Sequence, residues 1–454
     1  MRHAGEKRTE SFRGDMPGRD IALPMPGMGS GSAWGADMPW REEQAKQRQP
    51  CQRAWVKLWN AAAELAPSTC ARDRLSFERI LQGVARKIPV GAWAEGSHTE
   101  SLQALVASIN DTGDLHPFGA FYVSTFLGRF LEARGRLDAL WERQPEILEE
   151  RIPAPVIILG LPRTGTTFLF NLLARDPAHR YLRNWETTVS QLPPRKPTAM
   201  DRDPRRRIGR FLMRFQDALA PRLKDIHEFR LDGPEECTPL LFQGFATQAL
   251  SGLFNAPAYA RWLNSADRRP TYRHFRKILQ TLQWTYPGER WLLKSPDHLG
   301  ALDALLAAFP DARLIHLHRD PVQAVASWAS LKATFRGIYS RHVDAETVGE
   351  QILDRLGNDM DACLQARQRH DQNRFLDLSY RELVANPLSV AERVYGHFGM
   401  ELSETAQARM DAFLKADRKK KRAHRYAPED FGLTAARIAD RFQSYRARFP
   451  TLAA

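Results

Sequence analysis

Short apolar runs alternate with helical segments over the second half of the chain. The first run, at 156–159, is followed by a turn at 160–167 and then by apolar residues at helical spacing. Three more runs, at 291–293, 313–318 and 374–378, each precede a helical segment. Because strands that alternate with helices form parallel sheets covered on both faces, we expect an α/β fold with a parallel sheet flanked by helices.

The remaining segments predict two helical additions to this sheet. Residues 49–151 show apolar positions at helical spacing, so we expect a helical N-terminal region, whose role the pattern does not reveal. The stretch 186–288 has few strand signals and predicts a helical insertion over the site. Residues 1–48 are rich in Gly, Pro and charge without periodicity, which predicts a disordered tail. The main domain then spans 152–454.

The charge balance leaves several partners open. Against 53 acidic residues the chain has 66 Lys and Arg, a formal net charge of +13 at pH 7. This excess suits a polyanionic ligand, nucleic acid or an anionic membrane surface, and does not choose among them. Much of it is Arg spread through helical segments, where a solvated surface explains it. We expect no nucleic-acid partner, and the oligomeric state stays open.

The cysteines and the apolar content indicate a cytoplasmic protein. The four cysteines contain no CxxC pair, which argues against a disulfide framework or a zinc ribbon and fits a reducing compartment. No run of 18 apolar residues exists, so we expect no transmembrane segment. The N-terminus lacks the apolar core of a signal peptide.

Residues 160–167, with the sequence GLPRTGTT, join the first predicted strand to a helix. Glycines at GxxxxG spacing let backbone N–H groups wrap a phosphate, and the helix N-terminus adds a favourable dipole. An ATPase loop carries its Lys at the position of Thr166, whereas the cation here is Arg163, inside the loop. No predicted strand ends in the Asp that holds Mg²⁺ in such enzymes. The loop therefore suits an anion bound without a metal.

The segment 162–167 resembles the 5′-phosphosulfate-binding loop of the sulfotransferase superfamily, whose pattern is Pro-Lys/Arg-Ser/Thr-Gly-Thr-Thr. The resemblance extends over about 155–449. It implies a P-loop-type domain that uses 3′-phosphoadenosine 5′-phosphosulfate (PAPS) as co-substrate, with no metal. It also implies that the donor is held by the loop residues Arg163, Thr164, Gly165, Thr166 and Thr167.

A second signature lies about 150 residues further on. Arg319 ends a predicted strand and Ser327 follows it by eight positions, in the next helix. This geometry presents both side chains to one ligand at the rim of a parallel sheet. The segment is similar to the family's 3′-phosphate site, in which an Arg and a Ser at this spacing grip the phosphate.

Three further stretches are similar to family sites. Lys294 matches the Lys that bridges donor and leaving group, although Pro296 replaces the His that many cytosolic members place two residues later. Tyr380 matches a Tyr that lies against adenine. The basic stretch 419–422 resembles a C-terminal segment that closes over the nucleotide in bacterial members.

The general base has four candidates: Glu186, Glu235, Glu236 and His298. His298 follows Lys294 by one helical turn, although a packing role would also explain it. The pair at 235–236 follows Gly-Pro and would also serve to cap a helix. Glu186 lies 23 residues after Arg163 and resembles the catalytic Glu of tyrosylprotein sulfotransferases in order and spacing. Glu186 is therefore the preferred base, with Arg163, Lys294 and His298 as its catalytic companions.

Two other features are interpreted as structural. His316 and His318 form an HxH pair, but no neighbouring carboxylate or Cys in the sequence completes a metal-ligand set, so we expect packing histidines and no metal. The basic cluster at 202–214 would suit a sulfated or phosphorylated polymer, and a solvated helix face is the simpler interpretation.

These observations predict a sulfotransferase that moves a sulfuryl group from PAPS to a hydroxyl or amine of a small-molecule or glycan acceptor. Two alternatives stay open. A P-loop kinase or NTPase requires the loop Lys and a Mg²⁺-binding carboxylate, and neither is evident. A non-catalytic nucleotide-binding module would keep the loop and lose Lys294 or every reachable base.

Overall fold

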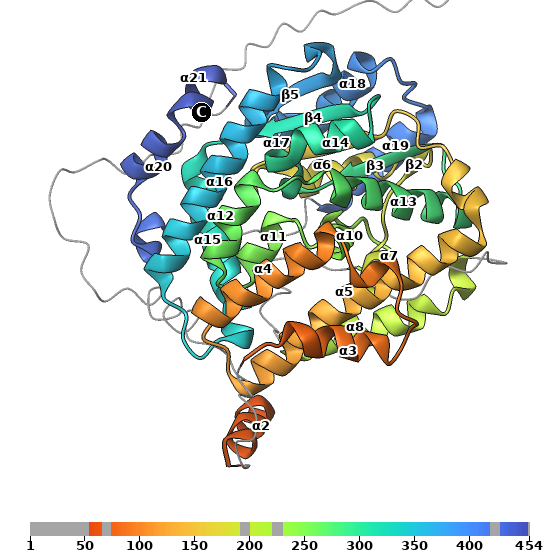
Figure 1. Ribbon diagram of the computed structural model, residues 1–454. Helices are drawn as coiled ribbons and strands as arrows, with labels where there is room; N and C mark the ends of the chain where they lie inside the picture. The colour runs from red at the N-terminus through yellow and green to blue at the C-terminus, as the bar shows by residue number, and fades with distance from the viewer. Residues whose placement is uncertain (1–53, 66–73, 191–199, 220–229, 418–426, 453–454) are drawn as a thin grey trace, which may run out of the picture. The chain divides into compact units, whose positions relative to one another are not determined.

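The computed structural model describes residues 54–65, 74–190, 200–219, 230–417 and 427–452 (Figure 1). They belong to one compact unit, Ala45–Ala454. The predicted tail at 1–48 and the basic stretch at 419–422 lie outside the described residues. This unit includes residues on both sides of position 151. The predicted boundary there, between the helical N-terminal region and the main domain, therefore stays a prediction.

Five parallel strands form the centre of the protein, in the order β2-β3-β1-β4-β5. Four of them confirm the strands predicted from the apolar runs. The fifth, β2, is a two-residue edge strand, too short to produce a pattern in the sequence. The strands are β1 (Val156–Gly160), β2 (His179–Arg180), β3 (Arg290–Lys294), β4 (Arg313–His318) and β5 (Phe375–Ser379).

Both faces of the sheet are covered, which explains why its strands are continuous apolar runs. Along β1, Ile157 and Leu159 enter one hydrophobic cluster, whereas Val156 and Ile158 enter another on the opposite face. The first cluster includes residues of helices α13 (Arg269–Thr285), α14 (Leu302–Ala308) and α16 (Ala345–Arg367). The second includes residues of helices α6 (Thr166–Leu173), α18 (Pro387–His397) and α19 (Glu404–Asp417). The result is the predicted three-layer α/β arrangement.

The helices of the two layers come from every part of the chain. The N-terminal helices are α2 (Ala54–Leu65), α3 (Phe77–Ala85), α4 (Ser97–Thr112) and α5 (Pro117–Arg143). Between β1 and β3 lie α6 (Thr166–Leu173), α7 (Asn184–Thr188), α8 (Arg205–Leu219), α10 (Thr238–Leu241), α11 (Gln248–Leu253), α12 (Pro257–Ser265) and α13 (Arg269–Thr285). After β3 come α14 (Leu302–Ala308), α15 (Pro321–Tyr339), α16 (Ala345–Arg367), α17 (Tyr380–Ala385), α18 (Pro387–His397), α19 (Glu404–Asp417), α20 (Ala435–Arg441) and α21 (Gln443–Arg448).

Short 3₁₀ turns join several of these helices. They are η1 (Ala92–Ala94), η2 (Pro145–Glu149), η3 (Met200–Arg202), η4 (Phe242–Gly244), η5 (Pro296–Ala301), η6 (Gln372–Arg374) and η7 (Pro428–Phe431). The turn η5 directly follows β3, so it lies at the carboxyl edge of the sheet.

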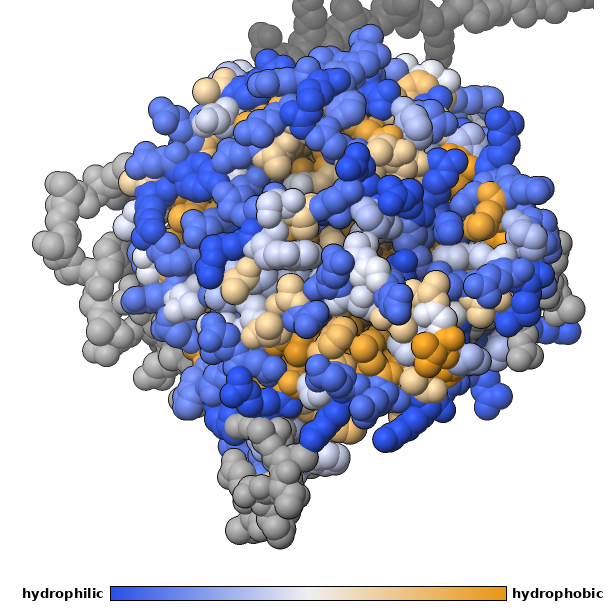
Figure 2. Space-filling view, in the orientation of Figure 1, coloured by the Kyte–Doolittle hydropathy of each residue, from blue (hydrophilic) through white to orange (hydrophobic). Residues whose placement is uncertain are grey.

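The N-terminal helices and the insertion share one hydrophobic cluster. It joins buried residues of α3, α4 and α5, such as Leu105 and Leu127, to Leu250 and Tyr259 of the insertion. On the outside, apolar side chains interrupt a mostly hydrophilic surface over the region of α3 and α5 (Figure 2). The N-terminal helices therefore support the insertion that borders the carboxyl edge of the sheet.

Candidate functional site

The loop after β1 has the geometry of an anion cradle. Gly160 and Gly165 have φ of 153° and 89°, and Arg163 has φ of 68°, in the left-handed region that non-glycine residues rarely adopt. A Cβ at Gly160 would lie 2.6 Å from the Leu317 carbonyl oxygen, so only glycine fits there. Such strain at a loop between strand and helix is typical of a binding site.

The loop presents donors to solvent while its centre is fixed. The Thr164 hydroxyl is buried and donates to the Leu161 carbonyl at 2.7 Å, which closes the turn. Helix α6 begins at Thr166, so the first N–H groups of the helix have no intrahelical acceptor. Arg163, inside the loop, and Thr167, at its end, are both exposed. These groups form a cradle for a phosphate or sulfate.

Arg319 and Tyr380 close one side of the same loop. The Arg319 guanidinium donates from Nη1 to the Arg163 carbonyl at 2.7 Å, and its carbon lies 4.0 Å from the centre of the Tyr380 ring. The Tyr380 ring packs so tightly over Gly165 that a Cβ there would approach Cδ2 to 2.9 Å. The structure therefore brings together four of the predicted residues, which come from three distant segments of the chain.

Ser327 is a buried hydroxyl with no partner. Its residue is 5% exposed, and its Oγ has no hydrogen bond in the described part of the protein. Ser327 lies on α15, two turns after Arg319 at the end of β4. Since buried polar atoms are nearly always paired, the Ser327 hydroxyl is available to pair with a bound group.

Lys294 is the buried cation at the end of β3. Its residue is 2% exposed, and its Nζ donates to the Thr167 hydroxyl at 3.2 Å and to Glu236 Oε1 in a short contact. The Glu236 side chain keeps 22% of its surface exposed, and its second oxygen accepts from Thr238 at 3.5 Å. A lysine, a partly exposed carboxylate and the loop threonine thus meet at one point, which suits proton transfer beside an anion.

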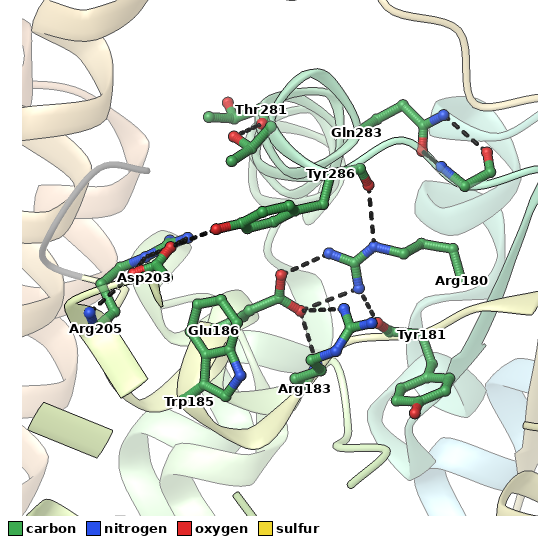
Figure 3. A network of polar contacts seen from close by, with 12 residues as sticks. Arg180, Tyr181, Arg183, Trp185, Glu186, Asp203, Arg205, Thr281, Gln283 and Tyr286 are labelled. Carbon is green, nitrogen blue, oxygen red and sulfur yellow. Dashed lines mark hydrogen bonds and ion pairs between the residues drawn. The ribbon is translucent and has the colours of Figure 1, made fainter. Parts of the chain in front are cut away.

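Glu186 lies instead in a closed ionic network (Figure 3). Its side chain has no exposed surface, and Arg180 donates to both carboxylate oxygens, at 2.6 and 3.0 Å. The Arg183 backbone N–H also donates to Oε2, at 2.9 Å, which caps α7. Burial alone would raise the pKa of Glu186, but the charges and hydrogen bonds of Arg180 and Arg183 outweigh it, and the net pKa is lowered. The structure therefore places Glu186 in a buried ion pair, and its role as base stays a prediction.

The two other predicted bases also serve the scaffold. His298 is fully buried in the main hydrophobic cluster, and its Nδ1 pairs with the Tyr272 hydroxyl at 2.8 Å. Burial lowers the pKa of His298 to about 3, which suits a neutral packing residue. Glu235 is buried and accepts from Asn184 at 2.8 Å. Of the four candidates, Glu236 alone contacts Lys294 among the described residues.

The HxH pair has a carboxylate neighbour that the sequence did not reveal. Asp377 of β5 lies with His316 and His318 in one cluster whose ligand atoms are within 4.8 Å of one another. Arg367 already fills this cluster, since it donates to both Asp377 oxygens at 2.7 and 2.8 Å and contacts His316 Nδ1 at 3.1 Å. Burial would raise the pKa of Asp377, but Arg367 and His318 hold it far below its usual range. The guanidinium therefore neutralises Asp377 and contacts one of the two histidines.

Two side chains that hold predicted site residues in place, Gln323 and Arg180, were not predicted from the sequence. Gln323 accepts from Arg319 in a short contact, and Arg180 belongs to a two-residue strand with no recognisable pattern. The i,i+4 spacing of Arg319 and Gln323 was a usable signal. The ion pair of Arg180 and Glu186 was not, because six residues and a turn separate them.

Comparison with known proteins gives consistent results. The model of the sulfotransferase family matches residues 155–404. The omega-hydroxy-beta-dihydromenaquinone-9 sulfotransferases of Mycobacterium bovis and Mycobacterium tuberculosis are each 25% identical over 281 residues, which cover 57% of this chain. The chain matches 66% of the length of these relatives.

Solved structures extend the likeness to most of the chain. A sulfotransferase from Mycobacterium tuberculosis (STF1) superposes with a TM-score of 0.70 at 29% identity, covering 82% of this chain and all of that structure. A sulfotransferase from Mycobacterium avium (STF9) gives 0.71 at 29% identity, with coverage of 84% and 98%.

The family match spans more than half of the 454 residues, and it includes the loop after β1, Lys294, Arg319 and Tyr380. None of the described helices combines the length and the apolar content needed to cross a bilayer. With its parallel sheet and its phosphate cradle, the chain belongs to the sulfotransferase family, a family of transferase enzymes.

Proposed function

We propose that this protein transfers a sulfuryl group from PAPS to a hydroxyl or amine of an acceptor. The observation that carries the proposal is the meeting of Lys294, Glu236 and Thr167 at the mouth of the phosphate cradle. A kinase would need a cation at Thr166 and a metal-binding carboxylate, whereas the cations of this site are Arg163, Lys294 and Arg319. A purely binding module would have no use for a carboxylate beside the buried lysine.

The donor fits the two halves of the cradle. Arg163 and the loop N–H groups would hold the phosphosulfate, while Arg319 and the unpaired Ser327 hydroxyl would hold the 3′-phosphate. The Tyr380 ring, stacked on Arg319, would lie against adenine. Charge-assisted hydrogen bonds of this kind contribute about 1.5–3 kcal/mol each.

The bound donor supplies an activated sulfuryl group, and the chain's own residues supply positioning and charge. Glu236 accepts the acceptor's proton as the acceptor oxygen or nitrogen bonds to sulfur. The bond from sulfur to the phosphate oxygen breaks, and 3′,5′-diphosphoadenosine leaves. Lys294 stabilises the charge that develops on that phosphate oxygen. In such in-line transfers, positioning and electrostatic stabilisation provide most of the rate enhancement.

For the acceptor we propose a small molecule with a hydroxyl group. The named relatives act on a hydroxylated dihydromenaquinone, which is a small molecule, and this supports the same class here. The two cysteines of the described residues, Cys237 and Cys363, are buried and reduced, which supports a cytoplasmic location.

Calorimetric titration tests the donor assignment. The product 3′,5′-diphosphoadenosine should bind at least tenfold more tightly than AMP or ATP, because only the first offers a 3′-phosphate to Arg319 and Ser327. The variant Arg319→Ala should lose most of this preference. Transfer of label from ³⁵S-labelled PAPS to mixtures of hydroxylated compounds tests the activity. Equal affinity of the wild type for all three nucleotides would overturn the proposal.

A further inference from the structure

Helix α8 is fastened to the body of the protein by its inner face. Arg205 is buried, and its Nη2 donates to Asp203 at 2.7 Å (Figure 3). Asp203 also accepts from the Tyr286 hydroxyl at 2.9 Å, and the Arg205 guanidinium lies 4.9 Å from the centre of the Trp185 ring. The beginning of α8 is therefore anchored by a buried ionic network.

A close contact one turn later fixes the orientation further. Gly209 is buried against α7, where a Cβ would lie 2.8 Å from the Trp185 Cβ. Arg206 forms an ion pair with Asp232 at 2.7 Å on the flank of the helix. With these contacts on one side, the opposite side of α8 must face solvent.

The outer side of α8 carries two parallel rows. Phe211 and Phe215 are 68% and 41% exposed, and they continue from the half-buried Ile208. The adjacent row consists of exposed arginines at the preceding positions, 207, 210 and 214. Within the described residues these three arginines form no ion pair. The helix contains a single acidic residue, Asp217.

We propose that this outer face of α8 binds the surface of a lipid bilayer that contains anionic lipids. Exposed phenylalanines are costly in water, and the apolar boundary beneath lipid headgroups would bury them. Arginines can lay their aliphatic stems along that boundary while their charged ends reach lipid phosphates. Charge complementarity selects anionic over neutral lipid, since each arginine near an anionic surface gains attraction. A polyanionic polymer would engage the arginines but leave the phenylalanines exposed.

Helix α8 is connected to the proposed catalytic base through α7. Helix α8 packs on α7, and Asn184 at the start of α7 donates to Glu235, the neighbour of Glu236. If the proposed function holds, a bilayer at α8 would bring membrane-dissolved acceptors near Glu236. The binding itself does not depend on sulfuryl transfer, so the two proposals can fail separately.

Vesicle co-sedimentation of the full-length protein tests the inference. The probes are vesicles of phosphatidylcholine alone and of phosphatidylcholine with 30 mol% phosphatidylglycerol. Binding should require the anionic lipid and weaken between 0.05 and 0.5 M salt, because the screening length shortens. Reversing the three arginines (R207E, R210E, R214E) should lower the apparent affinity by about 100-fold. The double variant F211S, F215S should lower it by about tenfold or more, with unchanged salt dependence.

Matched controls distinguish binding through the outer face of α8 from binding caused by net positive charge or by exposed apolar groups elsewhere on the protein. The triple variant R409E, R446E, R448E changes the net charge equally on exposed arginines of other helices, and L58S with V90S removes exposed apolar groups elsewhere. Both controls should bind vesicles like the wild type. Circular dichroism and melting temperature verify folding, and affinity for 3′,5′-diphosphoadenosine reports the donor site. The inference is overturned if the wild type ignores anionic vesicles, or if the α8 variants and the controls lose binding equally.

Discussion

Two carboxylates, Glu186 and Glu236, pair with cations near the carboxyl edge of the sheet. They differ in how much of each side chain stays exposed to solvent. Glu186 has no exposed surface, and both of its oxygens accept from Arg180. Glu236 contacts Lys294 with one oxygen while 22% of its side chain stays exposed. The first pair is complete, so it stabilises the fold. The second stays partly exposed and is paired with the buried Lys294, and this exposure is why we propose Glu236 as the base.

The difference shows that burial and charge alone do not identify a base. Both carboxylates follow the loop in sequence and both lie beside a buried cation. Solvent exposure separates them, because the Glu186 side chain has no exposed surface and the Glu236 side chain is 22% exposed. A general base must reach the proton that it removes, and geometry decides this before pKa does.

The largest expected effect separates the two carboxylates directly. Glu236→Gln removes the proposed base while keeping its shape, so kcat for sulfuryl transfer should fall by about 10²–10⁴-fold. Affinity for 3′,5′-diphosphoadenosine should be nearly unchanged. Glu186→Gln is the matched control, and its folded fraction should turn over at a near-normal rate. The opposite ranking of the two variants would return the role of base to Glu186.

The next largest loss of activity is expected at Lys294, the cation that pairs with Glu236. Lys294→Met retains the length of the side chain and removes its charge, so kcat should fall by about 10²–10³-fold, the usual loss when one stabilising donor is removed. Pre-steady-state measurement with labelled PAPS isolates the chemical step. A matched variant, Lys277→Met, removes an exposed lysine of α13 and should retain activity. A normal chemical step in Lys294→Met would exclude Lys294 from the transfer.

The buried ion pair of Arg180 and Glu186 should contribute to the stability of the fold and not to the rate of transfer. Glu186→Gln leaves Arg180 buried without its counter-charge, which costs about 3–5 kcal/mol in the free energy of unfolding. Urea denaturation at pH 7 measures this difference. A loss below about 1 kcal/mol would mean that the network in Figure 3 contributes little.

The same pair predicts a pH dependence. The lowered pKa of Glu186 in the folded state means that its stabilising effect is complete above the unfolded value of 4.5. It is lost as pH falls from there towards the folded pKa. The stability gap between wild type and Glu186→Gln should therefore be constant from pH 5.5 to 8 and shrink below 4.5. A gap that widened in acid would contradict the ion pair.

The smallest expected effect comes from chelation. Glu236 is paired with a lysine, and the Asp377 cluster is filled by Arg367, so both carboxylates already have cations. Turnover in EDTA should therefore equal turnover in buffer. Loss of activity that Mg²⁺ restores would show that a metal shares one of these sites.

The sequence predicted those parts of the site that lie in continuous segments. The loop from Gly160 to Thr167 and the spacing from Arg319 to Ser327 are local patterns, and their backbone geometry follows from glycine, proline and helix-start preferences. The four longer strands could also be predicted from the sequence, because strands buried on both faces of a sheet are continuous apolar runs.

Local sequence patterns could not decide which of the four candidate residues is the general base. The proposal for Glu236 depends on its contact with Lys294, 58 positions away, and Glu186 is paired with Arg180 on a strand of two residues. His298 was expected near the site from its spacing to Lys294, but the 3₁₀ turn η5 directs it into the hydrophobic core. Each outcome depends on tertiary contacts that local spacing does not encode.

The contact between Arg319 and the Arg163 carbonyl also has a kinetic consequence. It joins residues 156 positions apart, and both flanking strands must already be paired for it to form. Contacts of such long sequence separation form late and slowly, because the chain loses entropy before it gains them. The nucleotide cradle therefore forms only after strands β1 and β4 have paired. During refolding, recovery of diphosphoadenosine binding should lag behind recovery of helical signal, and the nucleotide should slow unfolding more than it speeds folding.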